Sequence, residues 1–180
     1  MVADLLKSDY SSSNFNLVLK NLVVKAENDA ADFTHIDSVE GVFLANTYDD
    51  ASIQYVTKMA ADSGATSQKS IKSVSDFVTT KISFNLGASW KYLRSPTVDS
   101  LGKPIRCSSA EDCRLHLNLH TNSMTPPIYS SENAPGIIIA TGCVGKFLCT
   151  NHYDFNTYMS TDGGVSWMEV AKVIFFYPEK

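Results

Sequence analysis

Two cysteines and two histidines near the middle of the chain could bind a metal. Cys107 and Cys113 are followed by His116 and His120, and two thiolates with two imidazoles can hold Zn²⁺ tetrahedrally. The cysteines are widely spaced for a zinc site, and the long spacer that usually precedes the histidines is missing. We therefore expect no metal site here, and we expect His116 to be a half-buried strand residue that hydrogen-bonds to a neighbour.

A second cysteine pair, Cys143 and Cys149, is followed by His152 and Asp154. A cysteine with a histidine and an acid could act as a nucleophile. These residues are adjacent in sequence, and no element orients the histidine as a base, so we predict no catalytic residue and no cofactor. The even number and close pairing of the four cysteines favour disulfides and an oxidising compartment. For Cys143 and Cys149, a disulfide and free buried thiols are equally compatible with the sequence.

Two eight-residue stretches, 83–90 and 160–167, share one spacing of Ser, Asp or Asn, Gly, Ser and Trp. In the second stretch the carboxylate of Asp162 can accept N–H groups of the residues just after it, and glycine permits a tight hairpin corner. In the first stretch Asn85 can act as a neutral acceptor in the same kind of turn. We predict purely structural roles for the matching residues, which are Ser83, Asn85, Gly87 and Trp90, and Ser160, Asp162, Gly164 and Trp167.

This spacing is the Asp-box pattern of sialidase-like β-propellers, in which each repeat is a short antiparallel sheet. The two tryptophans lie about 77 residues apart, whereas blades usually repeat at roughly 40–50 residues. We therefore expect about two blades within residues 15–180, with a disulfide-bearing insertion over 94–135 and a mobile loop over 49–76. Residues 1–14 look like a loose start. Two blades cannot close a propeller, so we expect a fragment of a larger domain.

The elements that hold these corners are predicted to be strands. Residues 15–24, 41–48, 77–84 and 136–142 are apolar or alternating runs, and residues 115–120 alternate leucine with histidine and asparagine. A short helix is possible around 56–62. The sequence therefore predicts an all-β fold.

The charge of the chain excludes one class of partner. Its net charge is −4 and its isoelectric point is near 5.5, with the basic residues spread out, so we expect no nucleic acid to bind. No run of about 18 apolar residues could span a membrane, and the first residues lack the apolar core of a secretory signal.

The order of features from residue 33 onward resembles the luminal domain of sortilin-type receptors, the vacuolar-protein-sorting-ten family. The chain departs from the family at Asn118, which stands where the family has a second histidine, at Asn85, and at the Cys143 and Cys149 pair. The matching residues are Val39–Asn46, Lys81–Asn85, Gly87, Trp90, Leu93, Pro96, Gly102, Pro104, Cys107, Cys113–Leu117, Ala134–Gly142, Val144, Gly145 and Ser160–Trp167.

The resemblance implies a ten-bladed propeller in the luminal part of a type I membrane receptor, and a Cys107–Cys113 disulfide. Such receptors bind protein or peptide ligands and carry them from the Golgi to endosomes or vacuoles. Membrane attachment would come only from a helix outside this chain, and no ligand-contact residue can be assigned to it.

Two other functions remain open. The chain could be a fragment of a propeller glycosidase, although its three arginines, Arg94, Arg106 and Arg114, lie too close together to surround a substrate carboxylate. It could also be a short decoy protein, although exposed strand edges would then invite aggregation.

Overall fold

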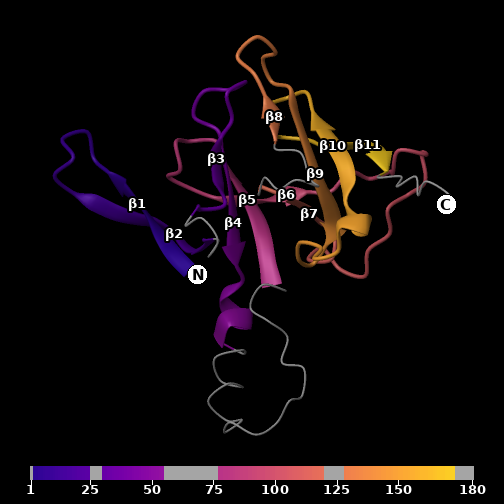
Figure 1. Cartoon of the computed structure of the whole chain (residues 1–180), viewed down its shortest axis with the longest axis horizontal. Coiled ribbons are helices and arrows are strands. Elements are labelled where there is room, and N and C mark those ends of the chain that lie inside the picture. The colour runs from indigo at the N-terminus through magenta and orange to yellow at the C-terminus, as the bar shows by residue number, and fades with distance from the viewer. Residues whose placement is uncertain (1, 25–29, 55–76, 120–127, 173–180) are drawn as a thin grey trace, which may run out of the picture.

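The computed structural model describes residues 2–24, 30–54, 77–119 and 128–172, and these residues form one antiparallel sheet of eleven strands (Figure 1). The prediction of an all-β fold made of about two propeller blades is confirmed. A short 3₁₀ helix, η2, spans His152–Asp154, and residues 50–54 are helical. The strands are β1 (Val2–Ser8), β2 (Phe15–Val23), β3 (Phe33–His35), β4 (Phe43–Tyr48), β5 (Val78–Ser83), β6 (Lys91–Arg94), β7 (Arg114–Leu117), β8 (Tyr129–Ser130), β9 (Ile138–Gly145), β10 (Asn156–Ser160) and β11 (Met168–Lys172).

The sheet contains the same five-strand unit twice, and we call strands β2–β6 blade 1 and strands β7–β11 blade 2. The strand order is β1-β2-β4-β5-β6-β7-β9-β10-β11, with β3 added to β4 and β8 added to β9. The registers of the two units also match. Phe43 faces Ser83 and His35 in blade 1, and Ile138 faces Ser160 and Ser130 in blade 2. Leu22 on β2 and Leu117 on β7 occupy equivalent places beside β4 and β9.

The main hydrophobic core lies between the two blades. Its fully buried members include Leu44 from blade 1 and Leu115, Leu117 and Ile138 from blade 2, and Trp167 is buried beside them. Each aliphatic side chain of this kind stabilises the fold by about 1.5–3 kcal/mol relative to leaving it in water. The blades therefore stack face to face, and each completes the core of the other.

The first residues form an ordered strand, so the prediction of a loose start over residues 1–14 is wrong for Val2–Ser8. Strand β1 pairs with β2 in a hairpin that lies beside blade 1, on the side away from blade 2 (Figure 1). Leu5 packs against a second core cluster formed by Leu19, Leu22 and Ala45. This contact orders the hairpin, because it removes apolar surface from water.

The predicted insertion over residues 94–135 is also wrong in its extent. Within it, Arg114–Leu117 and Tyr129–Ser130 are strands of blade 2, in the places that β2 and β3 occupy in blade 1. The additional segment between the blades is residues 95–113. Of the predicted loop over residues 49–76, residues 50–54 are helical, whereas the remainder from residue 55 and the helix predicted at 56–62 lie outside the described residues.

Candidate functional site

The second Asp box forms a closed hydrogen-bonded corner between β10 and β11. The hydroxyl of Ser160 donates to Asp162 Oδ1 (2.8 Å) and accepts from the N–H of Gly164 (2.8 Å). Asp162 also accepts the N–H of Ser166 (2.9 Å) and its hydroxyl (2.6 Å), and these hydrogen bonds lower the pKa of the Asp162 carboxyl. The indole N–H of Trp167 donates to the carbonyl of Gly164 (3.1 Å).

The first Asp box repeats this corner between β5 and β6 with a neutral acceptor. Ser83 donates to Asn85 Oδ1 (3.0 Å) and accepts from the N–H of Gly87 (2.9 Å). Asn85 accepts the N–H of Ser89 (2.9 Å), and its own amide donates to the Ser89 hydroxyl (2.9 Å). The Trp90 indole donates to the carbonyl of Gly87 (3.0 Å). An amide therefore replaces the carboxylate without changing the path of the turn.

Each corner also hydrogen-bonds to a glycine that shortly precedes a long strand of its own blade, β4 in blade 1 and β9 in blade 2. The N–H of Leu86 donates to the carbonyl of Gly41 (3.0 Å), and the N–H of Gly163 donates to the carbonyl of Gly136 (3.0 Å). Leu86 and Gly163 both have positive φ, 57° and 71°. Because a leucine rarely adopts this conformation, the first corner holds Leu86 in a strained backbone.

The second corner packs against the neighbouring blade. A Cβ added to Gly164 would lie 2.6 Å from Ile82 Cδ1, and one added to Gly163 would lie 3.0 Å from Val39. Both contacted residues belong to blade 1. The two glycines therefore allow close packing between the blades.

A buried polar network joins the blades near β5 and β7. The hydroxyl of Thr80 donates to Asn46 Oδ1 (2.7 Å) and accepts the N–H of Leu117 (2.9 Å), while the Asn46 amide donates to the carbonyl of Leu117 (3.2 Å). The backbone N–H of Thr80 donates to Nδ1 of His116 (3.1 Å), whose Nε2 lies 3.1 Å from the carbonyl of Gly145. The bonds from Asn46 and Thr80 of blade 1 to His116 and Leu117 of blade 2 cross the interface, so the network fixes the relative position of the two blades.

His116 must be neutral to make both of these bonds, and it is fully buried rather than half-buried as predicted. Since Nδ1 accepts from Thr80, the proton is on Nε2, which donates to Gly145. Burial is the main reason that the pKa of His116 falls to about 4. The polar residues of this network, Asn46 and Thr80, were not singled out from the sequence. For Asn46 the signal was a polar residue in the middle of an apolar strand, whereas β5 contains several polar residues and gives no such signal for Thr80.

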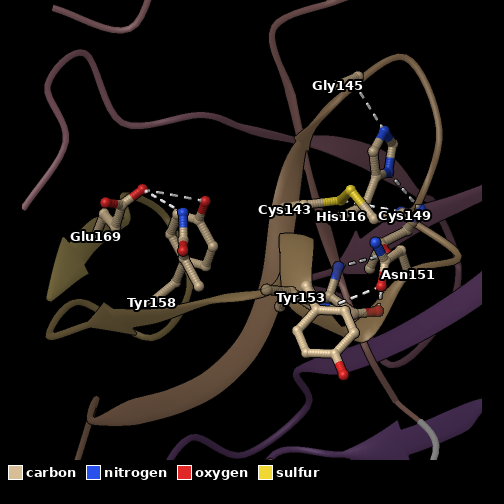
Figure 2. Close-up of a disulfide and its surroundings, with 11 residues drawn as sticks. His116, Cys143, Gly145, Cys149, Asn151, Tyr153, Tyr158 and Glu169 are labelled. Atoms are coloured by element: carbon tan, nitrogen blue, oxygen red, sulfur yellow. Dashed lines mark hydrogen bonds between the residues drawn. A yellow bond between two sulfur atoms is a disulfide. The ribbon is translucent and has the colours of Figure 1, made fainter. Parts of the chain in front are cut away.

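The second cysteine pair forms a disulfide beside this histidine (Figure 2). Cys143 and Cys149 are bonded with Cα atoms 6.2 Å apart, and Figure 2 shows His116 next to them. Because both sulfurs are in the disulfide, neither can act as a nucleophile, and the Cys-His-Asp alternative is excluded. The backbone of His152 and Asp154 lies in η2.

The disulfide also lines an open cavity of about 510 Å³ between blade 2 and the segment 95–113, and the buried carboxylate of Glu169 is part of its lining. Glu169 is only 8% exposed and accepts hydrogen bonds from Ser100, Asn156 and Tyr158. Burial, followed by the charge of Glu169, raises the pKa of the Tyr158 hydroxyl. Figure 2 shows Tyr158 directed toward Glu169.

The segment between the blades is attached to this cavity. In this segment the N–H and the hydroxyl of Ser100 donate to Glu169 (3.2 and 3.0 Å). Asp99 forms an ion pair with Lys172 of β11 (2.9 Å). Glu169 therefore anchors residues 99–104 to blade 2, and sequence patterns give no signal for an anchor that depends on this long-range contact.

The zinc-ligand set weighed as an alternative, Cys107, Cys113, His116 and His120, is not available for a metal among the described residues. Cys107 and Cys113 form a disulfide with Cα atoms 5.5 Å apart. A disulfide sulfur carries no thiolate to bind the metal, and His116 has both ring nitrogens engaged within the blade interface. His120 lies outside the described residues. No group of metal-binding side chains occurs among the described residues.

The three arginines do not form a carboxylate-binding centre. Arg94 on β6 and Arg114 on β7 are directly opposite each other in register, and Arg106 lies in the segment between these strands. The guanidinium of Arg114 stacks on the ring of Tyr92 at 3.8 Å. A sialidase site needs three arginines that converge on one carboxylate, and this arrangement does not provide it.

The chain forms two stacked blades with matching Asp-box corners, and comparison with known proteins agrees with this architecture. The family model described as Sortilin-Vps10, "Sortilin, neurotensin receptor 3", matches residues 1–178. The chain belongs to the Sortilin-Vps10 family. Its match begins at the first residue, so the β1–β2 hairpin is part of the family domain.

Relatives within the Sortilin-Vps10 family are similar over most of the chain. The vacuolar protein sorting/targeting protein 10 of Kluyveromyces lactis is 36% identical over 93% of this chain and 10% of its own length. The vacuolar protein sorting/targeting protein PEP1 of Saccharomyces cerevisiae is 33% identical over 94% of the chain and 10% of its own length. The sortilin-related receptor of Oryctolagus cuniculus is 32% identical over 82% of the chain and 6% of its own length. The chain spans about a tenth or less of these relatives.

Among the described residues, no helix has the length and apolar character needed to cross a lipid bilayer.

Proposed function

We propose that this chain is two adjacent propeller blades of the luminal domain of a sorting receptor. The receptor binds protein or peptide cargo and carries it from the Golgi to endosomes or a vacuole, and these blades perform no chemistry of their own. A membrane anchor and a cytoplasmic sorting signal would be supplied by other parts of the receptor.

The observation that carries the proposal is the family match over residues 1–178, with relatives named as vacuolar sorting proteins. The repeated blade supports it. Strand registers, Asp-box corners and the contacts of each corner are equivalent in the two units. A receptor needs a large and rigid surface to bind varied cargo, and stacked blades joined by a buried polar network provide such a surface.

A segment exchange in the Saccharomyces cerevisiae relative tests the proposal. The 172 aligned residues of the relative are replaced by the matching residues of this chain, in a strain that lacks the native receptor. We expect a vacuolar protein that depends on the receptor to reach the vacuole, and the secreted fraction to stay close to that of the wild-type strain.

A matched control keeps the exchange interpretable. The same chimera with Gly142→Ala, which disrupts contact between β7 and β9 (2.1 Å from the added Cβ to the His116 carbonyl oxygen), should secrete the vacuolar protein as the receptor-deleted strain does. The proposal is overturned if the unmodified chimera accumulates to normal levels in the endosomal fraction while its cells secrete as much vacuolar protein as the receptor-deleted strain.

A further inference from the structure

A groove runs between blade 1 and the Asp-box corner of blade 2, on the outer side of the main core. It encloses about 240 Å³ and is lined by Phe84, Lys91, Tyr92 and Arg94 of blade 1 and by Gly164 and Val165 of blade 2. Ile82 and Leu93 complete its lining. We call it the basic groove, because it contains two cations and no acidic residue.

Positive charge is concentrated around this groove on three neighbouring strands. Arg94 on β6 is directly opposite Arg114 on β7, and like charges in this relation repel each other. The ring of Tyr92 makes two cation–π contacts. Its centroid lies 3.8 Å from the guanidinium of Arg114 and 5.6 Å from the ammonium of Lys81 on β5. The charge of Arg114 also helps lower the pKa of Lys81, after the larger effect of burial.

Two of these four cations have no acidic partner in the part of the chain that the structure describes. Arg114 lies 4.0 Å from Glu111, and Lys81 is near the charges of Asp49 and Asp50. Lys91 and Arg94 make no ion pair with a described residue. Arg94 therefore faces Arg114 without an acidic partner of its own among the described residues, and an external anion would relieve this repulsion.

The groove also has the features that an extended peptide uses. Strand β6 pairs with β5 through Lys91 and Tyr92, and with β7 only through Leu93 and Arg94. No described strand pairs with the other edge of β6 at Lys91 and Tyr92, so backbone groups there can bind an added strand. Phe84 and Val165 on the rim are 42% and 65% exposed and offer apolar contacts.

We propose that the basic groove binds an extended acidic segment of the cargo, with its carboxylates on Lys91 and Arg94 and its apolar side chains on Phe84 and Val165. This inference rests on the proposed cargo-receptor function and specifies one class of peptide that the receptor binds. A short peptide fits better than a polyanion such as heparin, because the groove holds only two cations and also offers apolar contacts at Phe84 and Val165.

Binding of a fluorescein-labelled peptide of alternating glutamate and valine, followed by fluorescence anisotropy, tests the inference. Variants Lys91→Glu and Arg94→Glu are compared with Lys20→Glu, which reverses an exposed lysine on β2 outside the groove. The combined Lys91→Glu and Arg94→Glu variant should bind about tenfold more weakly, and Lys20→Glu should bind as the unmodified protein does. Arg94→Glu places a carboxylate opposite Arg114, so it should fold; Arg94→Leu is a second, neutral variant.

Each outcome either supports or overturns the proposal. Loss of binding in the groove variants alone, together with weaker binding at high salt, supports it. Equal binding by all variants, failure of the unmodified protein to bind the peptide, or tight binding of heparin at the same residues overturns it. The chimera assay separates the two proposals. If the chimera sorts its cargo and the Lys91→Glu and Arg94→Glu changes do not raise secretion of the vacuolar protein, cargo binding by the basic groove is refuted and the receptor function stands.

Discussion

Acid should weaken the contact between the two blades through His116, because this buried histidine must stay neutral. Its Nδ1 accepts the N–H of Thr80 in blade 1, and its Nε2 donates to Gly145 in blade 2. A proton on Nδ1 would turn that acceptor into a donor facing another donor. As pH falls, the unfolded chain takes up a proton on this histidine before the folded chain does. The fold is therefore at full stability above pH 6.5 and loses stability as pH falls toward 4.

The size of this effect follows from the two pKa values. With a pKa of about 4 in the fold and about 6.5 in the unfolded chain, the free energy of unfolding should fall by about 2 kcal/mol between pH 7.5 and pH 5. Domains are stable by only about 5–15 kcal/mol, so this loss is large. For a chain of 180 residues it corresponds to about 4–8 °C in melting temperature.

Urea unfolding followed by tryptophan fluorescence measures this loss. The variant His116→Gln removes the titrating group, and His35→Gln, which changes an exposed histidine, is the matched control. We expect His116→Gln to be less stable at pH 7.5, because it leaves a buried partner without its hydrogen bond. We also expect it to lose about 2 kcal/mol less than the unmodified protein between the two pH values. Light scattering at both pH values checks that the association state is unchanged.

The reasoning is refuted if the unmodified protein and His116→Gln lose the same stability between pH 7.5 and pH 5. It is also refuted if His35→Gln, rather than His116→Gln, abolishes the pH dependence.

The other predictions concern the corners, the blade interface and the disulfide. In urea unfolding, Asp162→Asn should lose about 1 kcal/mol less unfolding free energy than Asp162→Ala, because Asn85 makes the same turn in the first corner. Equal losses in the two variants would contradict this. Gly142→Ala should cost about 3 kcal/mol or more in a thermal melt, because its Cβ would lie 2.1 Å from the carbonyl oxygen of His116. Gly102 has a φ of 74°, but an added Cβ would meet no atom within 4 Å, so Gly102→Ala should lower the free energy of unfolding by only about 1 kcal/mol. A larger loss for Gly102→Ala than for Gly142→Ala would contradict the close approach of Gly142 to His116. Replacing both Cys143 and Cys149 by serine should lower the free energy of unfolding by about 2 kcal/mol, and reductant should then have no further effect at this pair; an unchanged urea midpoint would argue against the disulfide.

The Asp-box corners could be predicted from the sequence because everything that shapes them is local. Ser160, Asp162 and Ser166 contact each other within eight residues of chain, so their spacing alone describes the turn. The long strands were predictable for the same reason, since an apolar run such as Ile137–Ala140 needs no knowledge of its partner to be read as a strand.

Strand β1 was missed because its alternation is interrupted. Leu5 and Leu6 are consecutive, and the pairing with β2 shifts register between them. An irregularity of this kind breaks the period of two that identifies a strand. Strand β8 has only two residues, too few for any periodic pattern to reveal.

The place of β7 and the polar network could not be predicted, because both depend on residues far apart in sequence. Leu115 and Leu117 identify β7 as a strand, but its position in blade 2 is set by Val144 and Gly142 on β9. The bond between Thr80 and His116 likewise joins two blades. Only the stacked fold brings such groups together.

An immunoblot of native cells, separated into membrane and soluble fractions, tests most directly whether this chain is part of a sorting receptor. An antibody against residues 106–114 recognises the segment between the blades and the start of β7. We predict a band far above 19.7 kDa in the membrane fraction, as expected for a receptor of which this chain is about a tenth. A soluble band near 19.7 kDa, with none in the membrane fraction, would contradict the receptor function.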